Sequence, residues 1–134
     1  MKIRLDYVTN SSSSSFIIAK HKDCTLDEIK EILSEKQIKA YIKSLVKYYE
    51  NNADIPDTDY LKSIINKDYD VATEFALNDV AKQLFNKTKY YPLILGDWKV
   101  ITEEFSNENG TLFEEFIYEH GHELCSEHLK IHSN

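Results

Sequence analysis

The sequence predicts an α+β fold, with a small, mostly antiparallel sheet built from both chain ends and a helical middle (about residues 25–87) packed on one face. Apolar and polar residues alternate near both ends, which is the period of a strand with one buried face. Between the ends, apolar residues recur at the spacing of amphipathic helices. Neither end supplies enough strands for a stable sheet, so we expect the two ends to meet. The chain of 134 residues suits a single domain, 1–134.

Two strands are expected at the N-terminal end. Residues 2–7 alternate polar and apolar, and residues 16–19 form an apolar run that suits the middle of a sheet. Between them lie five consecutive serines, Ser11 to Ser15. Serine hydrogen-bonds nearby backbone and suits exposed turns. We therefore expect residues 10–15 to connect the two strands as a hairpin.

The helical middle begins at a capping box, Thr25-Leu-Asp-Glu28. In such a box the threonine hydroxyl accepts from the backbone three residues on, and the glutamate reaches back to the threonine amide. Apolar spacing then predicts a helix over residues 26–33, followed by residues 38–49 as a second helix or a kinked continuation. Further helices are expected over residues 60–65 and 71–85.

A β-hairpin is expected after the helices. Residues 91–95 and 98–105 are apolar-rich and flank Gly96-Asp97, which suits a two-residue hairpin loop. Pro92 has no amide hydrogen, so it belongs at the start of a strand or at a sheet edge.

A short helix and a last strand are expected near the C-terminus. Thr111-Leu-Phe-Glu114 is a second capping box and opens the helix. Gly121 is placed to end this helix in a left-handed conformation. Residues 128–132 alternate polar and apolar, which predicts the final strand.

The segment VTNSSSSSF, residues 8–16, is the most distinctive part of the chain. The opening residues 1–19 resemble the start of a loose group of small proteins of Firmicutes, especially Clostridia, and of their phages and mobile elements. The resemblance implies a bacterial or prophage-encoded accessory protein. It implies no reaction, no ligand and no site residue.

The net charge of −7 is concentrated in one region. Residues 97–128 hold nine acidic residues and one basic residue, Lys99, whereas the rest of the chain is nearly neutral. Such a field disfavours direct nucleic-acid binding and favours a protein partner with a basic surface. The simpler alternative is an acidic face that aids solubility. The expected partner-binding residues are Glu103, Glu114, Glu115 and Glu119.

Histidine and cysteine pairs are the candidates for metal binding. His21 and Cys24 form one pair with zinc-like spacing, and Cys125 and His128 form another. Nothing in the sequence brings the pairs together, and zinc motifs usually carry a Cys-x2-Cys knuckle that is absent here. We therefore expect no metal and no cofactor, with two reduced thiols.

No catalytic residue is predicted. The serine run lacks the glycine-flanked turn and positioned histidine of a nucleophilic serine. The adjacent pairs Glu103/Glu104 and Glu114/Glu115 do not converge, because neighbouring residues on a strand or helix point in different directions.

These observations favour a non-enzymatic protein-binding accessory factor of a prophage or mobile element. One instance is an acidic inhibitor of a host defence nuclease, of anti-CRISPR type. The alternative is a small enzyme or metal-dependent module that uses the His/Cys-rich C-terminus. The apolar runs are too short to cross a bilayer, and no signal-peptide pattern follows Lys2 and Arg4, so a cytoplasmic location is expected. The sequence does not name the partner or the oligomeric state.

Overall fold

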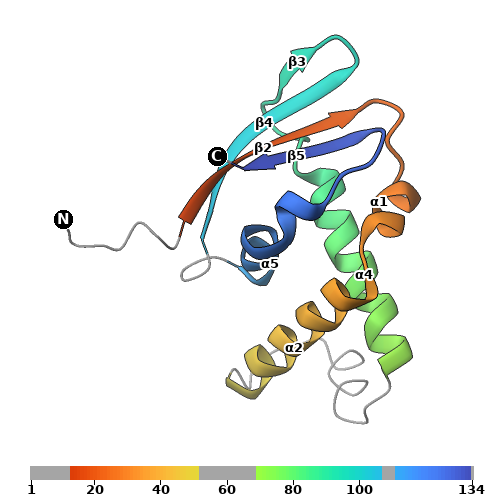
Figure 1. Cartoon of the computed structure of the whole chain (residues 1–134), viewed down its shortest axis with the longest axis vertical. Helices are drawn as coiled ribbons and strands as arrows, with labels where there is room; N and C mark the ends of the chain where they lie inside the picture. The colour runs from red at the N-terminus through yellow and green to blue at the C-terminus, as the bar shows by residue number, and fades with distance from the viewer. Residues whose placement is uncertain (1–12, 52–68, 107–110, 134) are drawn as a thin grey trace, which may run out of the picture.

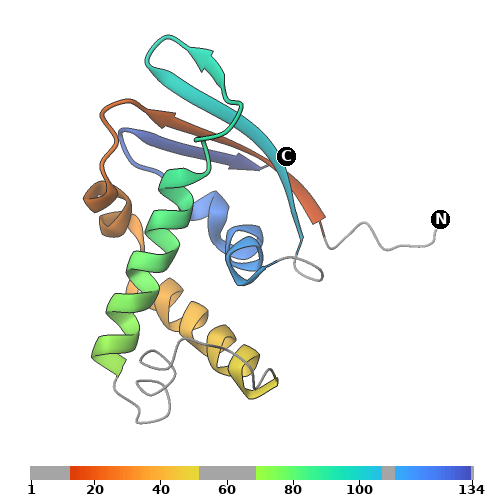
Figure 2. The same cartoon turned by 180° about the vertical axis from the view of Figure 1, so that it is seen from behind.

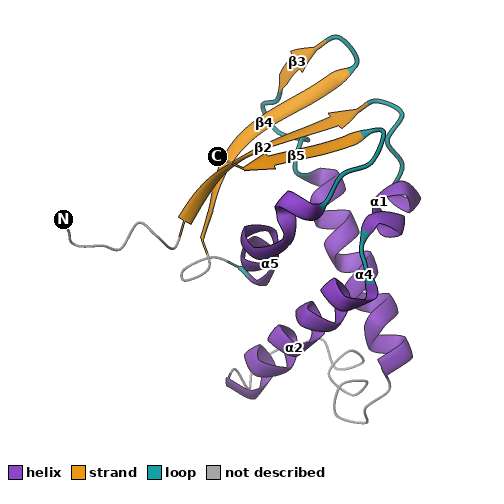
Figure 3. Cartoon of the chain, viewed as in Figure 1, coloured by secondary structure: helices purple, strands orange, loops and turns teal. Residues whose placement is uncertain are grey.

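The computed structural model describes residues 13–51, 69–106 and 111–133, and it has an α+β fold. The described strands form a four-stranded antiparallel sheet in the order β3-β4-β2-β5. The helices lie against one face of this sheet (Figures 1 and 3). The strands are β2 (Ser13–His21), β3 (Leu93–Leu95), β4 (Trp98–Ser106) and β5 (Leu129–Ser133).

Strand β2 joins the two ends of the chain. It pairs with β4 on one side and β5 on the other, and Ile18 lies opposite both Ile101 and Ile131. Phe16 and Ile18 are buried, because the apolar run that forms β2 sits in the middle of the sheet. The predictions of a central strand and of a sheet made from both chain ends are confirmed for the described residues.

The prediction that the serine run is a connecting loop is wrong for Ser13 to Ser15. These residues begin β2 and pair with Ser106, Phe105 and Glu104 of β4. Backbone hydrogen bonds between β2 and β4 pair the N–H and C=O groups that we expected the serine hydroxyls to bind locally. The predicted strand over residues 2–7, together with Ser11 and Ser12, lies outside the described residues.

The described helices agree with the predicted helical spacing. They are α1 (Leu26–Ile32), α2 (Glu35–Asn51), α4 (Tyr69–Asn86) and α5 (Leu112–His120), and a 3-10 turn, η2 (Gly121–Glu123), follows α5. Helix α2 begins earlier than predicted because Ser34 and Gln37 form a reciprocal cap, with distances of 2.8 and 3.1 Å. The predicted helix over residues 60–65 lies outside the described residues. In the described part of the chain, every helix is too short or too polar to cross a bilayer.

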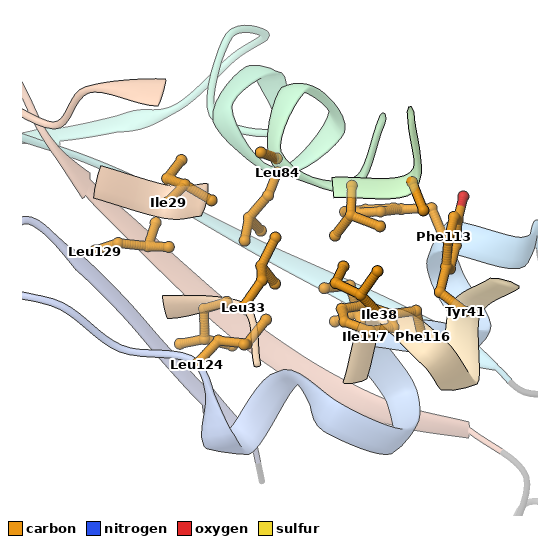
Figure 4. Close-up of a cluster of buried hydrophobic side chains, with 14 of the residues drawn as sticks. Ile29, Leu33, Ile38, Tyr41, Leu84, Phe113, Phe116, Ile117, Leu124 and Leu129 are labelled. Carbon is orange, nitrogen blue, oxygen red and sulfur yellow. The ribbon is translucent and has the colours of Figure 1, made fainter. Parts of the chain in front are cut away.

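The core lies between the sheet and the helices (Figure 4). Near α1, the side chains of Ile29 and of Leu33, the residue that follows α1, meet those of Leu84 from α4, Leu124 and Leu129. The region between α2 and α5 is filled by Ile38, Tyr41, Phe113, Phe116 and Ile117. Phe16 of β2 packs edge-on against Phe105 of β4, with ring centroids 5.4 Å apart. Apolar burial therefore attaches the helices to β2 and β4, the two inner strands.

The prediction that Gly121 ends α5 in a left-handed conformation is wrong. Its φ and ψ are −56° and −37°, which are right-handed helical values, and the chain continues into η2. A Cβ atom at this position would lie 3.0 Å from Cγ2 of Ile117 and 3.1 Å from Cε1 of Phe16. Close packing, and not a special backbone angle, is therefore what requires glycine here.

The β3–β4 hairpin forms as predicted. Gly96 has a φ of 61°, which suits a glycine at the first position of a two-residue loop. Pro92 immediately precedes β3, which is an edge strand of the described sheet. Both views of the fold show the tip of this hairpin projecting beyond the helices (Figures 1 and 2).

Candidate functional site

Strand β3 and the two tyrosines before it hold the most exposed large apolar side chains in the described part of the chain. Leu93, Ile94 and Leu95 are 62, 57 and 56% exposed, and Tyr90 and Tyr91 are 69 and 101% exposed. Successive side chains of a strand point to opposite faces, so both faces of β3 are open. Among the described strands β3 pairs with β4 alone, which leaves its other edge facing away from the sheet.

The opposite edge strand, β5, has a different composition. Leu129 and Ile131 are buried, and the exposed positions between and beside them are Lys130 and His132. Charged side chains on an edge strand discourage pairing with another chain. Strand β3 carries no charged residue, so it lacks this protection apart from its short length.

Tyr91 has an unusual backbone conformation. Its φ is 52°, and it precedes Pro92, a position that normally prefers extended backbone. Its side chain is fully exposed, so burial of the ring does not compensate for the strain. Strained residues of this kind concentrate at functional sites, and this one carries a fully exposed aromatic ring.

A groove of about 920 Å³ lies beside β3. It is bounded by the C-terminal part of α4, by β3 and β4, and by the start of α5. The lining residues are Lys82, Gln83, Asn86, Lys87, Tyr90, Tyr91, Leu93, Val100, Ile101, Thr102, Glu103, Thr111, Phe113 and Glu114. Because Tyr90, Tyr91 and Leu93 belong to both features, the groove and the exposed edge are continuous.

Two of the four glutamates that were predicted to bind a partner line this groove. Glu103 forms an ion pair with Lys87 at 2.5 Å, and Glu114 accepts the Thr111 backbone N–H at 2.8 Å. The second bond completes the predicted capping box of α5, in which both reciprocal contacts are present. Both carboxylates are therefore engaged within the fold.

The other two glutamates lie on the side of α5 that faces α2. Glu115 and Glu119 line a small hollow together with Tyr41. Burial raises the pKa of Glu115, and the neighbouring Glu119 charge adds to the shift. The four residues thus lie at two places: Glu103 and Glu114 line the groove beside β3, and Glu115 and Glu119 line the hollow that faces α2.

A second cluster lies where the end of β2, the β3–β4 turn and the loop before β5 meet. The His21 backbone N–H donates to the His128 carbonyl, and the Lys22 N–H donates to the Asp97 carbonyl, each at 2.9 Å. We call the side chains gathered here the histidine corner; they are His21, Asp23, Glu28, Asp97 and His128. The two histidine rings have centroids 5.0 Å apart, and Trp98 packs edge-on against His21 at 5.0 Å.

Glu28 departs from its predicted capping role. The Thr25 hydroxyl accepts the Glu28 N–H at 3.1 Å as expected, but the Glu28 carboxylate does not reach back to Thr25. It instead accepts the Ser126 hydroxyl, the His128 backbone N–H at 2.9 Å and the His128 Nδ1–H at 2.7 Å. A loop about a hundred residues away therefore outcompetes the local cap for this carboxylate.

These contacts shift the pKa values of Glu28 and His128 in opposite directions. The hydrogen bonds from Ser126 and then His128 lower the pKa of Glu28 to about 2. The hydrogen bond to Glu28 in turn raises the pKa of His128. Because a carboxylate only accepts hydrogen bonds, Nδ1 of His128 carries the donated hydrogen, and Nε2 is the nitrogen left for another partner.

Neither of the two predicted cysteine ligands belongs to the cluster of possible metal ligands in the described residues. Cys24 is buried, and its thiol faces the Thr25 carbonyl at 3.8 Å. Cys125 is exposed and free. Within the described residues, the group with metal-ligating geometry is His21, Asp23 and His128, whose ligand atoms all lie within 4.8 Å of one another. His21 and His128 were among the predicted candidates, and Asp23 was not.

Sequence reasoning missed two features of these sites. The uncharged Leu93–Leu95 run beside two tyrosines was a readable signal for an exposed edge, because natural edge strands usually carry charge. No local signal pointed to Glu28, because its partners come from the other end of the chain.

Comparison of the chain with protein-family models, curated proteins and solved structures gives no match.

Proposed function

We propose that this chain is a non-enzymatic protein-binding module that takes an extended segment of a basic partner protein along β3. The observation behind this proposal is the exposed, uncharged edge formed by Leu93, Ile94 and Leu95, which pairs only with β4 among the described strands. An extended segment adds to such an edge through main-chain hydrogen bonds, and alternate side chains then contact the two faces of the sheet.

The surroundings of β3 suit this mode of binding. Tyr90 and Tyr91 add aromatic contact area, and tyrosine is enriched at the energetic centres of interfaces. The adjoining groove can accept side chains of the incoming segment beneath the edge. Its rim is mixed in charge, since two lysines and two glutamates line it, so local contacts there are both apolar and polar.

The overall charge supports a basic partner. The net charge of −7 attracts a basic surface at long range, although the contact at β3 itself is apolar. Glu103, Glu114, Glu115 and Glu119 belong to the proposed partner surface as contributors to this field. A prophage-encoded inhibitor that occupies the basic groove of a host defence nuclease is one instance of this function.

The first experiment changes the edge and leaves the core intact. Wild-type protein and the variant Ile94→Lys are used as bait for chemical cross-linking in lysate of the source bacterium, and the cross-linked partner is then purified. We expect the partner to bind Ile94→Lys about tenfold or more weakly, a loss of about 1.4 kcal/mol. Val71→Lys, which changes another exposed apolar residue on α4, is the matched control and should bind like the wild type.

Two further measurements test the mode and the charge. A peptide copied from the cross-linked segment should lose binding when the backbone amides that face β3 are N-methylated, because strand addition uses those hydrogen bonds.

The rate at which the partner associates with this chain should fall as the salt concentration rises, and Glu119→Lys should slow this association at low salt. A partner that binds Ile94→Lys normally would contradict the proposal. Association of this chain only with itself through Ile94 would also contradict it.

A further inference from the structure

We infer that the histidine corner binds a divalent transition metal of the zinc class, with one nitrogen each from His21 and His128 and the carboxylate of Asp23 as ligands. Their ligand atoms lie within 4.8 Å of one another. This inference is independent of the proposed protein-binding edge, since none of these residues belongs to β3 or to its groove.

The donor set fits zinc. Imidazole nitrogen and carboxylate oxygen bind zinc at about 2.0–2.2 Å, which places two ligands of a tetrahedral site roughly 3.4 Å apart. Nδ1 of His21 and Oδ2 of Asp23 are already 3.7 Å apart. Asp23 lies in a turn with its side chain 63% exposed, so its carboxylate can move the short distance that coordination requires.

His128 is held as metal-ligating histidines usually are. Such histidines donate their second ring N–H to a carboxylate, which fixes the ring and leaves the other nitrogen for the metal. The Nδ1 of His128 makes this contact with Glu28 at 2.7 Å. The same carboxylate binds the backbone N–H of His128, so ring and main chain are held together.

His21 is also held in place before any metal binds. Its backbone is tied to the His128 carbonyl, and its ring packs against Trp98. One ring nitrogen, Nδ1, accepts the Asp23 amide at 3.1 Å, and the other, Nε2, lies 3.9 Å from Oδ2 of Asp97. A metal shared with Asp23 would replace the amide at Nδ1 and leave Nε2 facing the Asp97 carboxylate.

The site differs from a closed structural zinc site. Three protein ligands leave a fourth position for water or another ligand, whereas structural zinc sites usually have four protein ligands. Neither Cys24 nor Cys125 belongs to the cluster of possible ligand atoms in the described residues, so the ligand set that the structure indicates contains no thiolate.

The test uses the full chain, treated with a chelator and then dialysed. Zinc binding is followed by titration calorimetry, and cobalt binding by the visible absorption of the coordinated ion. We expect saturation at one equivalent. Asp23→Asn, which changes an exposed side chain, should weaken binding at least tenfold, and so should His128→Gln. Glu28→Gln should weaken it by roughly 10- to 100-fold, the usual effect of removing the carboxylate behind a ligating histidine.

Matched controls distinguish this site from nonspecific metal binding by other exposed side chains. His122→Ala and Cys125→Ser change exposed residues outside the cluster and should leave the affinity unchanged. Circular dichroism checks that each variant is folded. Absence of saturable binding, or equal affinity in folded Asp23→Asn, would overturn the inference. Loss of binding in Cys125→Ser would overturn it as well, because the ligand set would then include a thiolate.

Discussion

The two described glycines, Gly96 and Gly121, are needed for different reasons, and substitutions can separate those reasons. Gly96 has a φ of 61° and no atom within 4 Å of a built Cβ. Gly121 has a right-handed backbone, but its Cβ would lie 3.0–3.1 Å from two buried side chains. We predict that the order of stability of the alanine and asparagine variants reverses between the two positions.

The expected magnitudes follow from these contacts. At Gly121, replacement by alanine should raise the free energy of unfolding by about 0.5–1 kcal/mol through the unfolded state, because alanine restricts the unfolded chain. Overpacking against Ile117 and Phe16 costs about 1–3 kcal/mol, because both side chains are almost fully buried and cannot move aside easily. The difference between these two effects is a loss of up to about 2.5 kcal/mol for Gly121→Ala, with a central value of about 1 kcal/mol. Gly121→Asn should lose more stability because its side chain is bigger.

At Gly96 the expected order is the opposite. Alanine at positive φ costs about 1 kcal/mol, whereas asparagine adopts the left-handed conformation more readily and should cost only a few tenths. Nothing near the Cβ position penalises the larger side chain.

The assay is urea unfolding of the four variants followed by circular dichroism. The free energies of unfolding are compared with one shared value for their dependence on urea concentration. A Gly121→Ala protein at least as stable as the wild type would refute the packing argument. The same conclusion would follow if Gly121→Asn were more stable than Gly121→Ala, since that order is the mark of a left-handed position.

Three further predictions concern other contacts. Tyr41→Phe should lower the free energy of unfolding by about 1–2 kcal/mol, because the buried hydroxyl donates to Asp79 at 2.7 Å, and urea unfolding measures this loss. A hydrogen bond from Gln37 on α2 lowers the pKa of Glu123. The contribution of Glu123 to stability is therefore fully present above its ordinary pKa of 4.5, and it is lost as the pH falls through the lowered pKa of the folded protein. Glu123→Gln should therefore flatten the fall in stability on the acid side, as measured by unfolding at several pH values. A thiol reagent should modify exposed Cys125 in the native protein and reach Cys24, whose pKa is raised by burial, only after denaturant is added.

Much of the local structure was readable from the sequence. The apolar run in β2, the Gly96-Asp97 loop and the Thr111–Glu114 cap each depend on neighbouring residues, and each forms as predicted. The start of α2 was also readable, because Ser34 and Gln37 have capping-box spacing, although the prediction placed this helix later. Such elements are encoded locally because their contacts span only a few residues.

The candidate sites depend much less on local sequence. Glu28 and Thr25 form the same sequence pattern as Glu114 and Thr111, yet only the second pair completes its box. The first glutamate instead binds Ser126 and His128, which the packing of β5 beside β2 brings within reach. Ser13 to Ser15 are strand residues for a related reason, since pairing with β4 outweighs their preference for turns.

Composition and apolar periodicity directly specify the α+β class, the central position of β2, the hairpin and the negative charge. Contacts between distant parts of the chain set which polar side chains meet and which apolar side chains remain exposed. Pairing between strands that are distant in sequence sets the registers at which His21 approaches His128 and places β3 at an edge of the described sheet. Such pairings depend on packing across the whole domain, and a local pattern of residues does not specify them.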